Sequence, residues 1–222
     1  METALVKTRR RLRTRGGTRR RQGIVRLNTD AVSAILSPIY ADLPLTKAAG
    51  QHNLTYGEIE WATLKFIVGY TELHSPGEKG KFYDLGCGRG RAVLYMALVG
   101  PFEQSVGIEV LPERVSLAQQ ALVRLKSSIP TAGSKVRLYE ASFLNPAFKY
   151  KDARAIFISN MCFDEQTQIA IFHKLNSELQ KGALVFCSVL PSVIPSAFEV
   201  MGMEKVAMTW SPTSELHILR HL

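Results

Sequence analysis

A glycine-rich turn with the sequence D-L-G-C-G-R-G occupies residues 84–90 and is the segment best suited to binding a ligand. Glycine lets the backbone approach a bound molecule, and a helix that starts after such a turn offers free N–H groups. Taken alone, this G-x-G-x-G pattern is a weak signal, because a dinucleotide-binding fold contains a similar turn. Its meaning depends on the polar residues that accompany it.

Three polar side chains stand at the ends of predicted strands and strengthen the case for a ligand site. Asp84 precedes the glycines, where its carboxylate can reach an ammonium group of a ligand. Glu109 ends the next strand, where an acidic residue can bind both hydroxyls of a ribose. Asn160 ends a later strand, near the place where open α/β sheets bind ligands. These positions predict a ligand with both a ribose and an ammonium group.

The elements that must position these residues alternate between strand and helix. Periodicity predicts helices over residues 30–42, 58–73, 91–99, 112–127 and 165–180. It predicts strands over residues 82–85, 105–110, 135–139, 155–159, 183–189, 204–210 and 215–221. The last two strands are separated by Ser211-Pro212-Thr213, a hairpin signal. We therefore expect an α/β fold with a seven-stranded, mostly parallel, Rossmann-like sheet, helices on both faces and a C-terminal antiparallel hairpin.

The run D-L-G-C-G-R-G, followed by G-I-E at residues 107–109, resembles motifs I and II of class I methyltransferases. The resemblance implies that S-adenosylmethionine is the cofactor. It also implies that Gly86, Gly88 and Gly90 wrap the methionine moiety with Asp84 close by, and that Glu109 holds the ribose. The third glycine follows after one residue instead of two, which weighs against a nicotinamide dinucleotide.

A narrower resemblance, to the Dot1 family of histone lysine methyltransferases, covers roughly residues 30–222. It rests on Tyr56-Gly57-Glu58, the D-L-G-x-G turn, Ser142-Phe143-Leu144, the run S-N-M-C-F at 159–163, and Thr209-Trp210 through Leu216-His217. In that family the first segment forms a loop over the cofactor, and an acid and an aromatic residue contact the adenine. A further segment lines the methyl-transfer channel.

The resemblance assigns roles to particular residues of this chain. It implies that Glu58, Ser142, Phe143 and Asn160 join Asp84 and Glu109 in binding the cofactor. It places four residues beside the reacting groups: Asn160, Phe163, Trp210 and Tyr56. For Phe163 and Trp210, packing in the core is an equally good explanation. No histidine or cysteine has metal-ligand spacing, so we expect no metal site.

Several positions depart from the family pattern. Ser142 stands in place of an aspartate, so the adenine amino group would be held through a hydroxyl. Ser159 and Met161 replace an asparagine and a phenylalanine of the channel segment. Ser214-Glu215 replace an aromatic pair. These changes leave the identity of the substrate open, and they affect cofactor binding much less.

The net charge of +9 comes entirely from the N-terminal residues. Residues 1–26 hold ten basic groups and one acid, and the remainder of the chain is balanced. We expect residues 1–27 to be a basic, disordered arm, residues 28–75 a helical extension with the loop over the cofactor, and residues 76–222 the methyltransferase domain. The cations at 7–26 indicate binding to nucleic acid, and a mitochondrial transit peptide or a solubilising tail are the alternatives. No apolar run is long enough to span a membrane, so we expect no membrane partner.

The leading hypothesis is a protein-lysine N-methyltransferase of Dot1 type that acts on a histone in the nucleosome, in the nucleus. One alternative is a methyltransferase of RNA or of a ribosomal or organellar protein, located in mitochondria if the arm is a transit peptide. Another is a catalytically silent methyltransferase fold that serves as a binding or assembly factor. The altered channel residues keep this last alternative open, whereas the intact Asp84, Gly86 and Glu109 argue against it.

Overall fold

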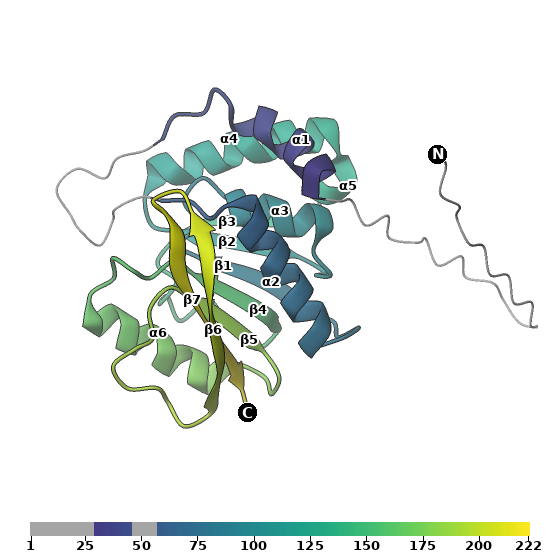
Figure 1. Cartoon of the computed structure of the whole chain (residues 1–222). Helices are drawn as coiled ribbons and strands as arrows, with labels where there is room; N and C mark the ends of the chain where they lie inside the picture. The colour runs from purple at the N-terminus through teal and green to yellow at the C-terminus, as the bar shows by residue number, and fades with distance from the viewer. Residues whose placement is uncertain (1–28, 46–56) are drawn as a thin grey trace, which may run out of the picture.

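The computed structural model describes residues 29–45 and 57–222, and its centre is a seven-stranded sheet (Figure 1). The strands are β1 (Lys81–Leu85), β2 (Ser105–Glu109), β3 (Val136–Glu140), β4 (Ala153–Ile158), β5 (Leu184–Cys187), β6 (Phe198–Met208) and β7 (Ser211–His221). Their order is β3-β2-β1-β4-β5-β7-β6. Strands β1 to β5 pair in parallel, whereas β7 pairs antiparallel with both β5 and β6. The predicted α/β fold with its C-terminal antiparallel hairpin is confirmed.

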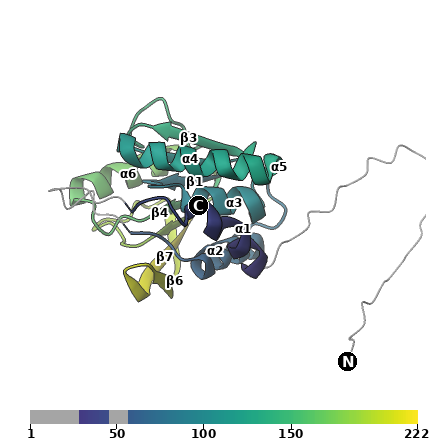
Figure 2. The same ribbon diagram turned by 90° about the horizontal axis from the view of Figure 1, so that it is seen from above.

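Helices cover both faces of the sheet, as the view from above shows (Figure 2). One face carries α1 (Thr29–Tyr40), α2 (Trp61–His74), α3 (Arg91–Val99), α4 (Pro112–Ser128) and the short α5 (Pro130–Gly133). The other face carries α6 (Glu165–Glu178). Among the described residues, no helix is long and apolar enough to cross a membrane.

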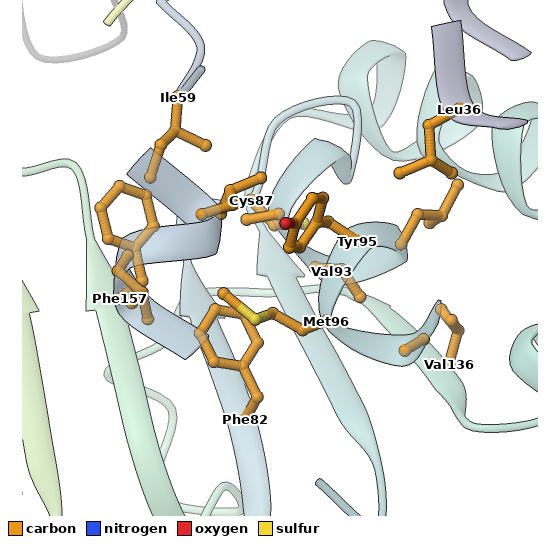
Figure 3. Close-up of a cluster of buried hydrophobic side chains, with 14 of the residues drawn as sticks. Leu36, Ile59, Phe82, Cys87, Val93, Tyr95, Met96, Val136 and Phe157 are labelled. Atoms are coloured by element: carbon orange, nitrogen blue, oxygen red, sulfur yellow. The ribbon is translucent and has the colours of Figure 1, made fainter. Parts of the chain in front are cut away.

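Alternate residues of the central strands feed two separate cores. Phe82 and Phe157 join the cluster under α3, together with Leu36 of α1 (Figure 3). Tyr83 and Ile156, their neighbours along the chain, join the cluster under α6. A parallel strand between two helical layers buries both faces, so β1 and β4 are buried almost throughout.

The second helix begins at Trp61, three residues later than the predicted start at Glu58. Ile59 instead forms an antiparallel bridge with Met208 of β6, and the Glu58 N–H donates to Thr209 Oγ1 at 2.9 Å. Residues 58–60 are therefore extended, because pairing with a distant strand overrides the local helical pattern. This pairing places the segment before α2 against the tip of the β6–β7 hairpin.

The C-terminal hairpin is longer than predicted, and its turn lies earlier. Strand β6 begins at Phe198 instead of Glu204, and Met208 pairs with Ser211, so the turn is Thr209-Trp210 and not Ser211-Pro212-Thr213. Proline is tolerated inside β7 because β5 pairs only with residues 217–220, which leaves Pro212 without a partner strand on that side. The half of the hairpin nearest its turn thus extends beyond β5 as a two-stranded ribbon.

Candidate cofactor site

A cavity of about 460 Å³ lies at the carboxyl ends of the parallel strands. Gly86 follows β1, Glu109 ends β2 and Ser159 follows β4, and all three line the cavity. Strands β2 and β3 lie on one side of β1, whereas β4 and β5 lie on its other side. The strand order therefore reverses between β1 and β4. Such a switch point leaves a crevice where ligands bind, and the volume suits an organic cofactor.

The glycine turn brings backbone to the cavity at two of its three glycines. Gly86 and Gly88 line it, with φ angles of 88° and 53° that favour glycine. Gly90 also has a positive φ but does not line the cavity. It is the N-cap of α3, and a Cβ there would lie 3.3 Å from the Ala118 Cβ. The small size of Gly90 thus serves helix packing, and its contact with the cofactor stays a prediction.

Glu109 is buried, and backbone amides fix the orientation of its carboxylate. Its Oε2 accepts the Gly88 N–H at 2.9 Å, and its Oε1 accepts the N–H groups of Val110 and Leu111 at 2.9 and 3.0 Å. These bonds compensate the burial of its charge and join β2 to the glycine turn. The carboxylate retains further lone pairs, so it can still accept from a pair of hydroxyls.

Asp84 is the second buried carboxylate of the cavity, and unlike Glu109 it is not bound by backbone amides of the described residues. Among the described residues, no donor binds its oxygens, although it lines the cavity. Burial, with a further effect from the charge of Glu109, raises the pKa of Asp84 to about 8. A buried carboxylate without a donor is costly unless a ligand completes it, and a cationic group on that ligand would do so. The Asp84 carboxylate therefore fits a ligand with an ammonium group.

Ser142 and Phe143 line the cavity beyond the end of β3. The Ser142 Oγ accepts the Leu144 N–H at 3.2 Å, and a hydroxyl in that position can still accept or donate one more hydrogen bond. The Phe143 ring lies 5.5 Å from the Phe163 ring between centroids. Both residues therefore lie in the cavity that contains Glu109, and their contact with an adenine stays a prediction.

Asn160 does not line the cavity and is fully buried behind it. Its Oδ1 accepts the Val189 N–H at 3.0 Å, and its Nδ2 donates to the Val189 carbonyl at 2.8 Å. Its carbonyl also accepts the Phe163 N–H at 3.1 Å. Asn160 therefore ties the loop after β4 to the segment after β5, and its direct contact with cofactor or substrate stays a prediction.

Glu58 lines the cavity, but its carboxylate binds arginines. Its two oxygens accept from Arg89 at 3.0 and 2.8 Å, and Oε2 also accepts from Arg91 at 3.1 Å. A bond from Glu58 to the cofactor, which the sequence predicts, would therefore have to compete with these bonds to Arg89 and Arg91. Tyr56, the other expected residue of the covering segment, lies outside the described residues.

Phe163, Met161 and Trp210 also line the cavity. A Cβ built on Gly86 would lie 3.6 Å from the Phe163 ring, so this ring faces the glycine turn. A Cβ on Gly57 would lie only 2.2 Å from the Trp210 ring, so the Gly57 backbone lies directly against the indole. The two aromatic residues thus line the cavity and also pack against the backbone at Gly86 and Gly57, and their role beside the reacting groups stays a prediction.

Arg91 is a cavity residue that the sequence reasoning did not single out. It is the first residue of α3, it pairs with Glu58 and Glu60, and its guanidinium lies 3.8 Å from the centroid of the Trp61 ring. Its place directly after the glycine turn was a usable signal, because the start of that helix must lie at the same sheet edge. A guanidinium there can bind a carboxylate of the ligand.

Comparison with known families settles the class of the protein. The model of the histone methylation protein DOT1 family matches residues 41–210. The chain belongs to the Dot1 family. No curated protein matches the sequence.

Solved structures of low sequence identity share the fold. The RNA methyltransferase from Salinibacter ruber in complex with S-adenosyl-L-homocysteine is 15% identical, with a TM-score of 0.50 over 72% of this chain and 90% of that one. The magnesium protoporphyrin IX methyltransferase from Synechocystis PCC 6803 with bound S-adenosylmethionine is 13% identical. Its TM-score is 0.56 over 85% of this chain and 90% of that one.

This Dot1-family chain is a methyltransferase whose cofactor is S-adenosylmethionine. When bound, the cofactor supplies a methyl group on a cationic sulfur. Asp84 suits its ammonium, Glu109 its ribose hydroxyls, and Phe143 the face of its adenine. The raised pKa of Asp84 and its lack of a donor among the described residues are the observations that fit this cofactor best.

Proposed function

We propose that this Dot1-family protein is a protein-lysine N-methyltransferase that acts on a histone in chromatin. The family match carries the proposal, because it extends over residues 41–210 and so includes both walls of the transfer end, Phe163 and Trp210. Apolar walls suit the methylene chain of a lysine. The proposal places the protein in the nucleus.

Lysine methylation requires a neutral amine aligned with the bond between methyl and sulfur. The nitrogen forms a bond to the methyl carbon as the bond to sulfur breaks, and its extra proton leaves for solvent before attack. Phe163, Met161 and Trp210 would surround the lysine side chain, and burial among apolar groups lowers the pKa of an amine. The walls therefore promote the reactive form of the substrate and exclude competing water.

The basic arm gives the chromatin proposal a second element. Ten cations in residues 1–26 can bind DNA phosphates, whereas the rest of the chain has equal numbers of basic and acidic groups. A nucleosome presents DNA beside histone, so the arm would hold the particle while the cavity receives a lysine.

The direct test supplies labelled S-adenosylmethionine with nucleosomes, free histones, ribosomal particles and RNA in parallel reactions. We expect the label in a histone lysine, located by mass spectrometry, with nucleosomes methylated faster than free histones. Glu109→Ala, at a cofactor concentration below its weakened affinity, is the control and should incorporate much less label. Label in RNA or in a ribosomal protein would contradict the histone proposal. Binding of cofactor without label in any substrate would indicate a silent assembly factor.

Methylation of RNA is the second candidate function. The same basic arm that suits DNA also suits RNA, and the structurally similar protein from Salinibacter ruber is an RNA methyltransferase. This candidate predicts label in the RNA of the parallel reactions. If residues 1–26 are a transit peptide, their fusion to a reporter should deliver it to mitochondria.

A further inference from the structure

Arg89, in the middle of the glycine turn, is buried and does not line the cavity. Its Nε and Nη2 donate to the two carboxylate oxygens of Glu58 at 3.0 and 2.8 Å. Its Nη1 donates to the backbone carbonyls of Leu43 and Pro44 at 2.6 and 3.2 Å. One guanidinium therefore binds three separate residues outside the turn.

These partners lie on the two sides of residues 46–56. Leu43 and Pro44 follow α1, and Glu58 precedes α2. Tyr40 adds a contact from α1, since its hydroxyl donates to the Arg89 carbonyl at 3.3 Å. The turn that contacts the cofactor is thus bonded to the chain both before and after this segment.

Stability alone explains this arrangement poorly. A buried ion pair gives little net stability, because desolvation of both charges offsets their attraction, and an apolar pair of similar size is often as stable. What a two-pronged guanidinium–carboxylate pair supplies is a fixed distance and orientation. Glu58 and its neighbours Gly57 and Ile59 line the cavity, so the geometry fixed here is that of the cavity itself.

We propose that Arg89 is a positioning residue for the cofactor: its pair with Glu58 sets the separation between the glycine turn and the cavity wall at Gly57–Ile59. The proposal rests on the assignment of the cavity to S-adenosylmethionine and is independent of the methyl acceptor. Glu58 also accepts from Arg91, so the pair additionally fixes a cation that lines the cavity.

A double-mutant cycle tests the proposal with Arg89→Met, Glu58→Met and the double variant. Thermal unfolding of the free protein and calorimetric affinity for S-adenosylhomocysteine are measured for each, the affinity well below every melting temperature. Arg89→Met removes the two-pronged partner of Glu58 and leaves it the single bond from Arg91, whereas Glu58→Met leaves the buried Arg89 guanidinium without this carboxylate. Both single variants should therefore melt earlier and bind the ligand at least about tenfold more weakly. The double variant should regain melting temperature but not affinity.

The affinity effects should also be non-additive, because both variants break the same connection. Additive losses would mean that Glu58 contacts the ligand independently of Arg89. Recovery of affinity together with melting temperature would mean a merely structural role. Either result overturns the proposal, as would wild-type affinity in Arg89→Met.

Arg124→Met is the matched control. Arg124 also anchors the end of α1, through the Ile39 carbonyl and an exposed pair with Asp42, but it does not line the cavity. The affinity of Arg124→Met for S-adenosylhomocysteine should lie within about twofold of the wild-type affinity, since exposed ion pairs contribute little to stability. If wild type itself fails to bind, the cofactor assignment fails; if wild type and Arg89→Met bind equally, only the positioning role fails.

Discussion

Asp84 and Glu109 place two carboxylates in one buried cavity, and the surrounding chain treats them differently. Three backbone amides bind Glu109, whereas none of the described residues donates to Asp84. The pKa of Asp84 is raised to about 8 as a result of burial and of its neighbour's charge. Asp84 thus reduces the stability of the free protein wherever it is ionised, and a cationic ligand recovers that loss.

Asp84→Asn should stabilise the free protein at alkaline pH. Between an ordinary pKa of 3.8 and a folded value of about 8, the folded state binds more protons than the unfolded state. The free energy of unfolding therefore falls as pH rises through this window. We expect denaturant melts to show Asp84→Asn about 1–3 kcal/mol more stable than wild type near pH 9 and much closer to it near pH 5.

Asp164→Asn is the control for this measurement. Asp164 is the exposed N-cap of α6, and the Thr167 N–H that it accepts lowers its pKa. Its contribution to stability is present throughout the range above its ordinary pKa, so this variant should shift the curve without changing its slope between about pH 5 and pH 9. A wild-type curve as flat as that of Asp84→Asn would refute the raised pKa.

The sequence predicted which side chains reach the cavity where this depends only on their position at the end of a strand. Asp84 and Glu109 end adjacent strands, so the βα pattern alone brought them to one cavity. The partners of Asn160 and Glu58 were not predictable, because Val189 and Arg89 lie 29 and 31 residues away and their approach depends on how loops pack. Sequence pattern indicates which edge a residue occupies, but not what its side chain binds there.

At the scale of elements, the hairpin tip and the segment before α2 form one unit. The Thr209 N–H donates to the Glu58 carbonyl, the Glu58 N–H donates to Thr209 Oγ1, and Ile59 pairs with Met208. The Trp210 ring lies against Gly57. Gly57, Ile59 and Trp210 of this unit line the cavity, so its packing affects the shape of the cavity.

Gly57→Ala should disturb this unit. The added Cβ would lie 2.2 Å from the Trp210 ring, so the indole must move. We expect a loss of about 1–3 kcal/mol in unfolding free energy, with weaker cofactor binding measured by calorimetry. Adding Trp210→Ala should make the Gly57→Ala loss smaller, since the clash then disappears.

Gly69→Ala is the matched control, because Gly69 lies within α2 and a Cβ there meets nothing within 4 Å. It should stabilise the protein by up to about 1 kcal/mol, as alanine does in a helix. Equal behaviour of the two alanine variants would contradict the close packing of Gly57 on Trp210.

The elements themselves followed from the sequence wherever local pattern and tertiary context agree. The core strands and helices α3, α4 and α6 lie close to their predicted bounds. The start of α2 and the extent of β6 did not, since Ile59 and Phe198 pair with strand residues that the local sequence cannot reveal. Long-range pairing accounts for both differences.

At the scale of the whole molecule, the charge is divided between the arm and the remaining chain. All nine net charges lie in residues 1–26, while residues 27–222 are balanced. Deletion of residues 1–26 should leave cofactor affinity unchanged, because the described residues that line the cavity lie between Gly57 and Trp210. It should remove most binding to nucleosomes or RNA.

Salt dependence measures the contribution of the arm. With about 6–10 phosphate contacts, the full chain should lose roughly 10³–10⁵-fold in affinity between about 50 and 200 mM salt. The truncated chain should depend on salt only weakly, and its methylation of nucleosomes should fall more than its methylation of a free peptide. Equal binding of nucleic acid by both proteins would leave the arm as a solubilising tail.

The most direct test of the cavity as the S-adenosylmethionine site is calorimetry with that ligand near pH 7, in two buffers of different ionisation enthalpy. Wild type should bind and release most of one proton, because a cationic ligand ionises an Asp84 whose pKa is about 8 when free. Glu109→Ala should bind about 1.5–3 kcal/mol more weakly, and Asp84→Asn should release no proton. Absence of binding by wild type, or unchanged affinity in Glu109→Ala, would contradict the assignment of this cavity.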